Sequence, residues 1–347
     1  MKTLHVAYLD KFIPGFITLM RAHCPDGQYY FTYGVMNDYP YEEGKDSTHI
    51  ERSTGALSTM RERYIPLLSK MYKAEKIVLH GLFDFNLIAL LFFNPLLLKK
   101  VHWIIWGGDL YNFVSPDDSL VGKIKFYIRR KSIENFGFLL TYLDKDIELV
   151  REIYGAKGTH LECLMYTSNV YKQLEITKGI ESQINIQVGN SSDPSNNHIS
   201  ALNIIEPFID NNVTVHIPLS YGDDGYSKQV AEYVAANHPE RVECLHDFMA
   251  MDEYLSFLGG IDIAIFNHDR QQAMGNIITL LGLGKTVYLR PGTAQWELFS
   301  NQGIVVRSIE SFDMALLTDD ERDSNMALIK SLYSMEKLIS QYKQLFQ

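Results

Sequence analysis

Short apolar segments alternate with longer segments of helical periodicity along the chain. In the first half, strand-like apolar segments lie at residues 4–9, 76–81, 101–108 and 138–143. In the second half, they lie at residues 184–189, 212–219, 241–248, 261–268, 285–291 and 303–308. Strands that alternate with helices are typical of parallel sheets covered by helices on both faces. The pattern therefore predicts an α/β protein.

A polar, weakly periodic segment at residues 171–183 interrupts this alternation and is the candidate linker. We expect two Rossmann-like domains, residues 1–180 and 181–325, that face a central cleft. Residues 326–347 have apolar positions at helical spacing and predict a helix that can cross back onto the first domain. Ligands of open α/β sheets bind at the carboxyl ends of the strands, so residues that follow strands are the functional candidates.

Charge and cysteine content exclude several classes of protein. The chain has 347 residues and a formal net charge of -10, whereas general nucleic-acid binding needs a basic surface. Cys24, Cys163 and Cys244 lie far apart and suggest neither a disulfide framework nor a zinc site. The N-terminal segment predicts a first strand rather than a secretory signal. We expect a cytoplasmic protein that uses no metal and no cofactor.

The sequence "GNSSDPSNNH" at residues 189–198 lies between a predicted strand and a predicted helix. A glycine-bearing turn at a helix N-terminus presents backbone N–H groups and the positive end of the helix dipole, which together suit a diphosphate. A capped turn without a ligand has the same composition, and this alternative stays open.

A second loop of this kind, "DRQQAMG" at residues 269–275, follows another predicted strand. Arg270 can pair with a phosphate, and Gln271 and Gln272 can donate hydrogen bonds to it. Gly275 and Asn276 would begin a helix whose N-terminus faces the cleft. Two such loops in one domain favour a phosphorylated ligand.

Aromatic residues follow a further strand of the second domain. Tyr221 and Tyr226 flank a Gly-Asp turn, where an aromatic ring can stack on a base or shape a sugar pocket. An ordinary turn explains the same residues equally well.

Two titratable residues follow strands of the first domain. Asp109, in "WIIWGGDLY", is presented by a Gly-Gly turn and is a candidate general base; alternatively it caps the next helix. His80, in "VLHGLFDF", is a second candidate base or a structural histidine. The acidic sequence "DKD" at residues 144–146 opens a helical pattern, so we interpret it as capping and charge complementation rather than as a metal site.

A basic segment at residues 121–132 has apolar positions at helical spacing and predicts an amphipathic helix. Its cations are Lys123, Lys125, Arg129, Arg130 and Lys131. Such a helix can lie on an anionic membrane surface, and the apolar segment at residues 86–98 adds to this possibility. A solvated helix face is the alternative.

The segments "QVGNSSDPSNNHISAL", "PLSYGDDGY", "FNHDRQQAMGNIITLLGLGKTVYL" and "WGGD" together resemble glycosyltransferase family 56. These are the bacterial 4-acetamido-4,6-dideoxygalactose transferases of enterobacterial common antigen synthesis. The resemblance covers most of the chain and implies B-type glycosyltransferase architecture. It further implies a nucleotide-sugar donor in the C-terminal domain, a polyprenyl-diphosphate-linked acceptor in the N-terminal domain, and peripheral attachment to the cytoplasmic membrane face.

The motifs and the resemblance together define the expected donor-binding set. It comprises Gly189, Asn190, Ser191, Ser192, Asn196, His198, Tyr221, Tyr226, Arg270, Gln271, Gln272, Gly275 and Asn276. The sequence departs from the family pattern in three places: Ser192 replaces a glycine, Pro194 replaces a basic residue, and Ala273-Met274 alter the second loop.

The sequence thus predicts a metal-independent glycosyltransferase of surface polysaccharide synthesis, of the common-antigen or O-antigen type. A deoxyamino sugar would move from a deoxythymidine diphosphate (dTDP) donor to a lipid-linked saccharide, with Asp109 favoured over His80 as the base. One alternative is a nucleotide-sugar epimerase or hydrolase of the same fold. Another is a two-domain ligand-binding protein without chemistry.

Overall fold

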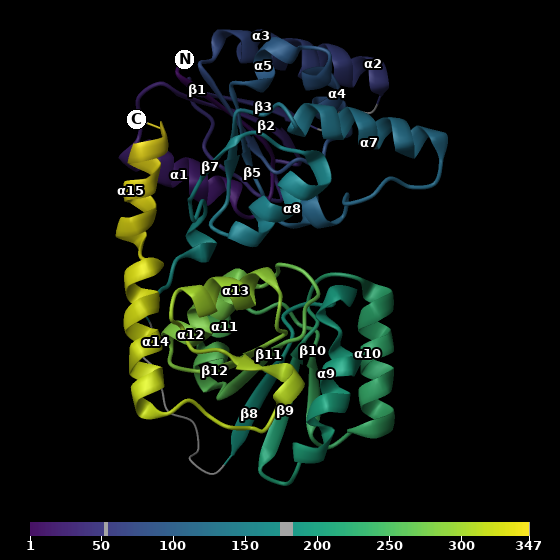
Figure 1. Cartoon of the computed structure of the whole chain (residues 1–347), viewed down its shortest axis with the longest axis vertical. Coiled ribbons are helices and arrows are strands. Elements are labelled where there is room, and N and C mark those ends of the chain that lie inside the picture. The colour runs from purple at the N-terminus through teal and green to yellow at the C-terminus, as the bar shows by residue number, and fades with distance from the viewer. Residues whose placement is uncertain (52–54, 174–182, 347) are drawn as a thin grey trace. The chain divides into compact units, whose positions relative to one another are not determined.

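The computed structural model describes residues 1–51, 55–173 and 183–346 (Figure 1). The chain forms two units: unit 1 comprises Met1–Ser168 and Met335–Gln347, and unit 2 comprises Asn169–Ser334. The division lies at residue 168 rather than near 180, and most of the predicted linker falls at 174–182, outside the described residues. The segment that returns to unit 1 begins at Met335 rather than at residue 326.

Unit 1 contains a seven-stranded sheet in the order β3-β2-β1-β4-β5-β6-β7. Its strands are β1 (Thr3–Tyr8), β2 (Gln28–Gly34), β3 (Ser47–Glu51), β4 (Lys76–His80), β5 (Val101–Ile104), β6 (Phe138–Leu140) and β7 (Thr159–Leu161). Every neighbouring pair is parallel. The order reverses between β1 and β4, which is the switch point where ligands of Rossmann folds bind.

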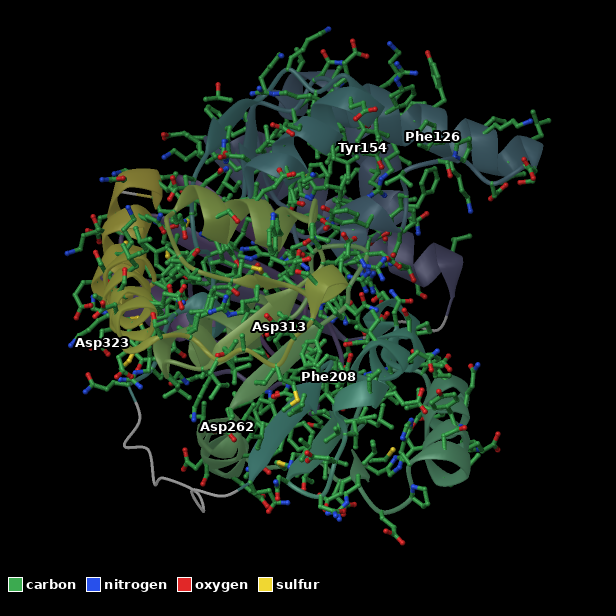
Figure 2. All side chains as sticks on the ribbon, turned by 60° about the horizontal axis from the view of Figure 1, so that its bottom comes forward. Phe126, Tyr154, Phe208, Asp262, Asp313 and Asp323 are labelled. Atoms are coloured by element: carbon green, nitrogen blue, oxygen red, sulfur yellow. The ribbon has the colours of Figure 1, made fainter. Side chains whose placement is uncertain are left out.

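Helices cover both faces of this sheet (Figure 1). They are α1 (Ile13–His23), α2 (Ala56–Thr59), α3 (Ile65–Lys73), α4 (Phe85–Phe92), α5 (Pro95–Leu98), α6 (Gly108–Tyr111), α7 (Leu120–Ile133), α8 (Asp144–Tyr154) and α15 (Met335–Phe346), with short η1 (Met60–Tyr64) and η2 (Thr167–Asn169). The helix predicted in the apolar segment at 86–98 ends at Phe92, because Pro95 cannot continue it and instead begins α5. Figure 2 shows Phe126 of α7 beside Tyr154 of α8, and their rings lie 5.9 Å apart.

The C-terminal helix α15 completes the core of unit 1. Leu338 and Tyr342 are fully buried, and α15 packs against α1. The Gln341 Oε1 atom accepts a hydrogen bond from the Leu164 amide at 3.0 Å. The Gln28 side chain donates to the Phe346 carbonyl, also at 3.0 Å.

Unit 2 contains a six-stranded parallel sheet in the order β10-β9-β8-β11-β12-β13. Its strands are β8 (Ile184–Val188), β9 (Val213–Pro218), β10 (Val242–Leu245), β11 (Ile263–Phe266), β12 (Thr286–Leu289) and β13 (Arg307–Ser308). Written from its own first strand, this is the order 3-2-1-4-5-6 of a dinucleotide-binding Rossmann fold. The switch point lies between β8 and β11.

The helices of unit 2 follow the strands in turn. They are α9 (His198–Ile205), α10 (Asp224–Asn237), α11 (Met251–Gly260), α12 (Met274–Gly282), α13 (Ala294–Asn301) and α14 (Asp319–Leu332), with short η3 (Pro194–Asn196), η4 (Glu206–Phe208) and η5 (Ile309–Ser311). Apolar side chains of β8, β9 and β11 form the core with α9. Phe208 packs edge-on against Phe312 at the margin of this core, near the labelled Asp313 in Figure 2.

Candidate functional site

Two polar loops meet at the switch point of unit 2. Residues 189–197 follow β8, and residues 267–273 follow β11. Because these strands are neighbours and parallel, both loops emerge at the same edge of the sheet. The two sequence motifs singled out as anion-binding candidates therefore lie at the place where this fold binds ligands.

A buried asparagine holds the first loop. The Asn196 Oδ1 atom accepts hydrogen bonds from the Asn190 amide at 3.1 Å and from His268 Nε2 at 2.8 Å. Gly189 has a φ of 68°, and a Cβ atom there would lie 2.4 Å from His198 Nε2. Only glycine fits this turn, so the conformation of the loop is fixed by its own sequence.

Two buried histidines in this region are neutral. Burial lowers the pKa of His198 to about 4 and that of His268 to about 3. His268 donates from Nε2, so its Nδ1 atom carries a lone pair. Neither His268 Nδ1 nor His198 Nε2 has a hydrogen-bond partner among the described residues. These rings shape the site without adding positive charge to it.

Side chains join the two loops directly. Ser195 Oγ lies 2.5 Å from Gln272 Oε1, and Arg270 Nη2 lies 3.1 Å from Asp193 Oδ2. Burial raises the pKa of Asp193, but hydrogen bonds from Ser195 and the charge of Arg270 outweigh this effect and lower it overall. Asp193 is therefore a carboxylate that holds Arg270 at the edge of the site.

The loop after β9 joins the same cluster. The Ser192 amide donates to the Tyr221 carbonyl at 2.8 Å, and Asn190 Nδ2 donates to the Tyr221 hydroxyl at 2.9 Å. The His198 amide donates to the Tyr226 hydroxyl at 3.1 Å. Loops after three adjacent strands thus form one hydrogen-bonded surface.

The structure brings the predicted donor-binding residues together but divides them into two kinds. The buried ones, which support the loops, are Gly189, Asn190, Ser191, Ser192, Asn196 and His198. The accessible ones are Tyr221, Tyr226, Arg270, Gln271, Gln272, Gly275 and Asn276. Their contact with a donor stays a prediction.

The first loop was expected to present unpaired backbone N–H groups to a diphosphate, but several of them already have acceptors. Those of Ser192, Ser195 and Asn196 already donate hydrogen bonds within unit 2, so the loop presents fewer free amides than its sequence suggests. The second loop leads into α12, whose first three amides have no acceptor within the helix. The start of α12 is therefore the better source of free N–H groups.

Sequence reasoning missed one basic residue of this site. Arg290 follows β12, forms an ion pair with Asp269, and donates to Asn267 Oδ1 at 2.8 Å from Nη2. Its position directly after a predicted strand was the signal that could have identified it. Arg270 and Arg290 are both held by carboxylates in this structure, and an anion would compete for both.

Asp109 has the environment of a structural residue. It is fully buried, and its carboxylate accepts from the amides of Leu82 and Trp106 at 2.8 Å each and from Trp103 Nε1 at 2.7 Å. Burial raises its pKa. A general base must reach the proton that it removes. The geometry favours the structural alternative, in which Asp109 ties together the loops after β4 and β5.

His80 lies in a chain of buried hydrogen bonds. Gln28 uses its amide nitrogen on main-chain carbonyls, so its Oε1 accepts from His5 Nε2 at 3.0 Å. Burial lowers the pKa of His5 to about 4, so neutral His5 accepts at Nδ1 from His80 Nε2 at 3.2 Å. His80 Nδ1 then accepts from the Tyr166 hydroxyl at 2.7 Å. Both nitrogens of His80 are engaged, which favours a structural role.

The predicted basic helix forms as α7, but Arg129 was wrongly placed among its membrane contacts. Arg129 is buried and donates to the carbonyls of Leu82 and Asp109, and its guanidinium lies 4.2 Å from the centroid of the Phe113 ring. The four other predicted cations, Lys123, Lys125, Arg130 and Lys131, are exposed. The buried face of α7 is formed by Gly122, Arg129, Ser132 and Ile133.

Burial of this face leaves apolar side chains of α7 in solvent. Leu120, Val121, Ile124 and Tyr127 are exposed, and Tyr127 contacts Phe92 of the neighbouring helix α4. Phe93 and Leu96 are exposed at the adjacent junction of α4 and α5. We call these six apolar residues, with Lys123, Lys125, Arg130 and Lys131, the α7 surface. Among the described helices, none has the length and apolar character needed to cross a bilayer.

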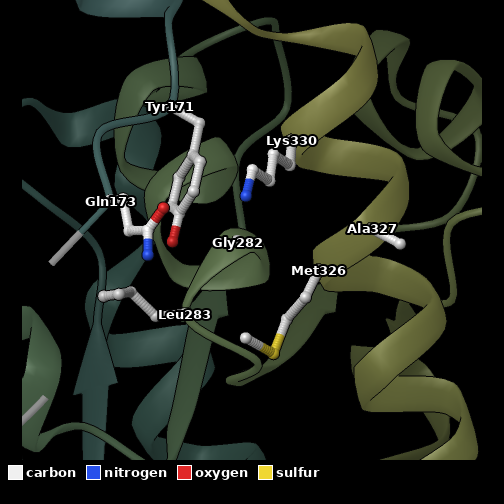
Figure 3. A pocket seen from close by; sticks show the side chains of 7 residues that line it. All are labelled: Tyr171, Gln173, Gly282, Leu283, Met326, Ala327 and Lys330. Carbon is white, nitrogen blue, oxygen red and sulfur yellow. The ribbon is translucent and has the colours of Figure 1, made fainter. Parts of the chain in front are cut away.

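The remaining sites are less informative. Within residues 1–51, 55–173 and 183–346, no three His, Cys, Asp or Glu side chains are grouped to hold a metal ion, and metal independence stays a prediction. Figure 3 shows a small pocket between α12 and α14, lined by residues that include Tyr171 and Lys330. It lies at the C-terminal end of α12, which precedes β12, and not at the carboxyl ends of the strands.

Solved structures share this fold over nearly their whole length. HepE of Anabaena in complex with UDP-glucose has a TM-score of 0.65 at 10% identity, and 99% of each chain is covered. Sucrose-phosphate synthase of Thermosynechococcus elongatus has a TM-score of 0.64 at 12% identity, covering 100% of this chain and 98% of that one. WaaG, a glycosyltransferase of lipopolysaccharide biosynthesis, has a TM-score of 0.58 at 12% identity, with the same coverage. The fold is that of the B-type glycosyltransferases.

A family model narrows this class. The model described as 4-alpha-L-fucosyltransferase glycosyl transferase group 56 matches residues 59–327. The chain belongs to glycosyltransferase group 56 and is a glycosyltransferase enzyme, which confirms the family resemblance found in the sequence.

Proposed function

We propose that this enzyme moves a deoxyamino sugar, 4-acetamido-4,6-dideoxygalactose or a similar one, from a dTDP donor to a polyprenyl-diphosphate-linked saccharide. The observation that carries the proposal is the cluster of three hydrogen-bonded loops at the switch point of unit 2, where a diphosphate can meet Arg270 and the start of α12. Family membership and HepE, which binds UDP-glucose, support a nucleotide-sugar donor.

The chemistry assigned to unit 2 is stabilisation of the leaving group. As the bond between the sugar and the diphosphate breaks, negative charge grows on the diphosphate. Arg270, Gln272 and the first amides of α12 would be positioned to meet that charge without a metal. In free enzyme, Asp193 satisfies Arg270, so donor binding exchanges one anionic partner for another.

The α7 surface supports the assignment of a lipid-linked acceptor. Its exposed apolar residues lie among exposed cations, a combination that suits the anionic cytoplasmic face of a bacterial membrane. Peripheral attachment there would bring the enzyme to an acceptor that cannot leave the bilayer. The product would be a surface polysaccharide of the common-antigen or O-antigen type.

The test is calorimetric titration of the purified protein with dTDP, UDP and GDP, with and without magnesium. We expect selective binding of dTDP that magnesium does not change. Selective binding of UDP or GDP would contradict the proposed donor while retaining a nucleotide-sugar transferase. Binding of none of the three would contradict the assignment of the switch-point loops.

A further inference from the structure

The switch point of unit 1 lies between β1 and β4. Asp10 follows β1 by two residues, and Phe83 follows β4 by three. Asp109, by contrast, follows β5, one strand away from the switch point. Two carboxyl groups lie at this ligand position, those of Asp10 and Asp84. Asp84 accepts hydrogen bonds from the Tyr64 hydroxyl and from the amides of Asn86 and Leu87 at the start of α4, which leaves Asp10 as the candidate.

The Asp10 carboxyl group is half-buried and incompletely paired. Its Oδ1 atom is buried and has no hydrogen-bond partner among the described residues. Burial raises the pKa of Asp10, although the charge of Lys11 and the amide of Phe12 act in the opposite direction. The Asp10 side chain is partly exposed, so a ligand can reach its carboxylate, whereas the Asp109 carboxylate is fully buried and fully paired.

Aromatic rings adjoin Asp10 along the same edge of the sheet. The Phe12 ring lies 5.6 Å from that of Trp106, and Trp106 lies 6.0 Å from Phe83. Tyr166 donates to His80 and accepts from Trp106 Nε1 at 2.9 Å, which fixes the indole. Phe83 is 47% exposed. An exposed ring next to a fixed indole offers an apolar face on which a sugar ring can lie.

We propose that Asp10 is the catalytic base, and that the terminal sugar of the acceptor lies on the rim formed by Phe83 and Trp106. This inference rests on the proposed function and adds the acceptor site to it. The partly exposed Asp10 takes the role that sequence reasoning gave to Asp109 or His80.

The reaction follows from this placement. The acceptor hydroxyl oxygen forms a bond to the anomeric carbon of the donor sugar as the bond from that carbon to the diphosphate breaks. The bonding pair leaves with the nucleoside diphosphate, and the hydroxyl proton moves to the Asp10 carboxylate. A single displacement of this kind inverts the anomeric configuration.

The first test compares Asp10→Asn with Asp26→Asn. Asp26 is exposed and precedes β2, so the control makes the same charge change at the amino edge of the sheet. With saturating dTDP-sugar and lipid-linked acceptor, we expect Asp10→Asn to lower kcat by about 10²- to 10⁴-fold, the usual contribution of a general base. The dissociation constant for dTDP should stay at the wild-type value, the Tm should not fall, and the control should retain wild-type kcat. A kcat for Asp10→Asn within about threefold of wild type would overturn the assignment.

The second test uses Phe83→Ala, with Tyr72→Ala as the control. Tyr72 is 49% exposed but belongs to α3, directly before β4, and so lies at the opposite edge. We expect Phe83→Ala to raise the acceptor KM by about five- to tenfold with kcat nearly unchanged, because stacking on an aromatic ring contributes modestly to binding. An unchanged acceptor KM would remove the aromatic rim from the proposal.

Wild-type enzyme supplies a third result that no folding defect can affect. NMR of the product formed by the wild-type enzyme should show inversion, and retention would exclude Asp10 as the base of a single displacement. Absence of dTDP binding would instead contradict the proposed function. The two failures are therefore distinguishable.

Discussion

At the scale of single residues, burial separates the side chains that support the loops from those that stay accessible. Asn196 and Asp109 are fully buried, and their side-chain hydrogen bonds hold loops in place. Arg270 follows β11 of unit 2 and Asp10 follows β1 of unit 1, and both are only partly buried. Sequence position predicted that Asn196, Asp109 and Arg270 follow strands, whereas Asp10 was not among the candidates. It could not predict which of them turn inward, because that depends on partners far away in the chain.

Substitutions at the two partners of the Arg270–Asp193 pair should change dTDP affinity in opposite directions. Arg270→Ala should weaken dTDP binding by roughly 1.5–3 kcal/mol, the range for a hydrogen bond to a charged group. Asp193→Asn removes the competing charge and should tighten binding several-fold. Calorimetry measures both. Arg241→Ala, at a partly exposed arginine that donates to Asn211, is the control and should bind dTDP as wild type does.

A second prediction concerns Asp146, which the sequence suggested to be a capping residue. The side chain is instead buried and accepts from the Tyr111 hydroxyl at 2.7 Å, and burial raises its pKa to about 7. A raised carboxyl pKa means that stability is lost as pH rises from about 4 to about 7. Asp146→Asn should therefore raise the Tm at pH 8, with a gain that shrinks toward pH 4. Asp144→Asn, at an exposed position of the same helix, should not; equal effects would contradict burial as the cause.

At the scale of elements, the periodicity of α7 predicted the helix but not which of its sides is buried. Apolar residues at helical spacing predicted the helix, but its apolar side faces solvent and its inward side contains Gly122 and Arg129. The reversal has a physical cause, since Arg129 donates to two carbonyls in loops that α7 covers. Those carbonyls belong to distant segments of the chain, so the hydrophobic pattern of residues 120–133 does not indicate them.

Membrane association is tested on this element. Lys123→Glu combined with Lys125→Glu should release the protein from anionic vesicles, because each cation near such a surface contributes about 1 kcal/mol. Co-sedimentation with vesicles of defined composition measures this. Lys45→Glu with Lys73→Glu makes the same charge change at other exposed positions of unit 1 and should leave binding intact. Equal loss in both variants would indicate an effect of net charge rather than of the α7 surface.

The strands were predicted unevenly. Continuous apolar segments such as β4 and β11 were located from the sequence, and so was the α/β class that follows from them. The strand β2, "QYYFTYG", was missed because its tyrosines and threonine break the apolar run, although it is largely buried. The edge strands β3 and β7 are only partly buried and carry almost no apolar signal. Their pairing is decided by the neighbouring strand.

At the scale of the whole molecule, buried histidines make stability depend on pH. Burial lowers the pKa of His5, His102 and His198 to about 4 and that of His268 to about 3. A lowered histidine pKa gives stability that is complete above about 6.5 and is lost as pH falls toward the folded value. At pH 5, each of these histidines lowers the free energy of unfolding by roughly 2 kcal/mol relative to neutral pH. The sum is larger than the free energy that protonation of Asp146 adds.

Thermal unfolding should therefore begin at a lower temperature at pH 5 than at pH 7.5. Both units should lose stability, because unit 1 contains His5, His80 and His102, unit 2 contains His198 and His268, and burial lowers the pKa of each. Hydrogen exchange followed separately in the two units at pH 5 and pH 7.5 measures the loss in each. Equal protection at both pH values would show that the histidines are not held neutral.

The return of α15 to unit 1 has a consequence for synthesis on the ribosome. Unit 1 begins with β1, but residues 335–346 supply its last core side chains and the carbonyl that Gln28 binds. All of unit 2 is translated before that segment emerges. The first unit therefore cannot complete its core during synthesis, and the surface that Tyr342 later covers stays accessible to chaperones. The second unit already has every residue that it needs to fold. Folding order and chain order are thereby reversed.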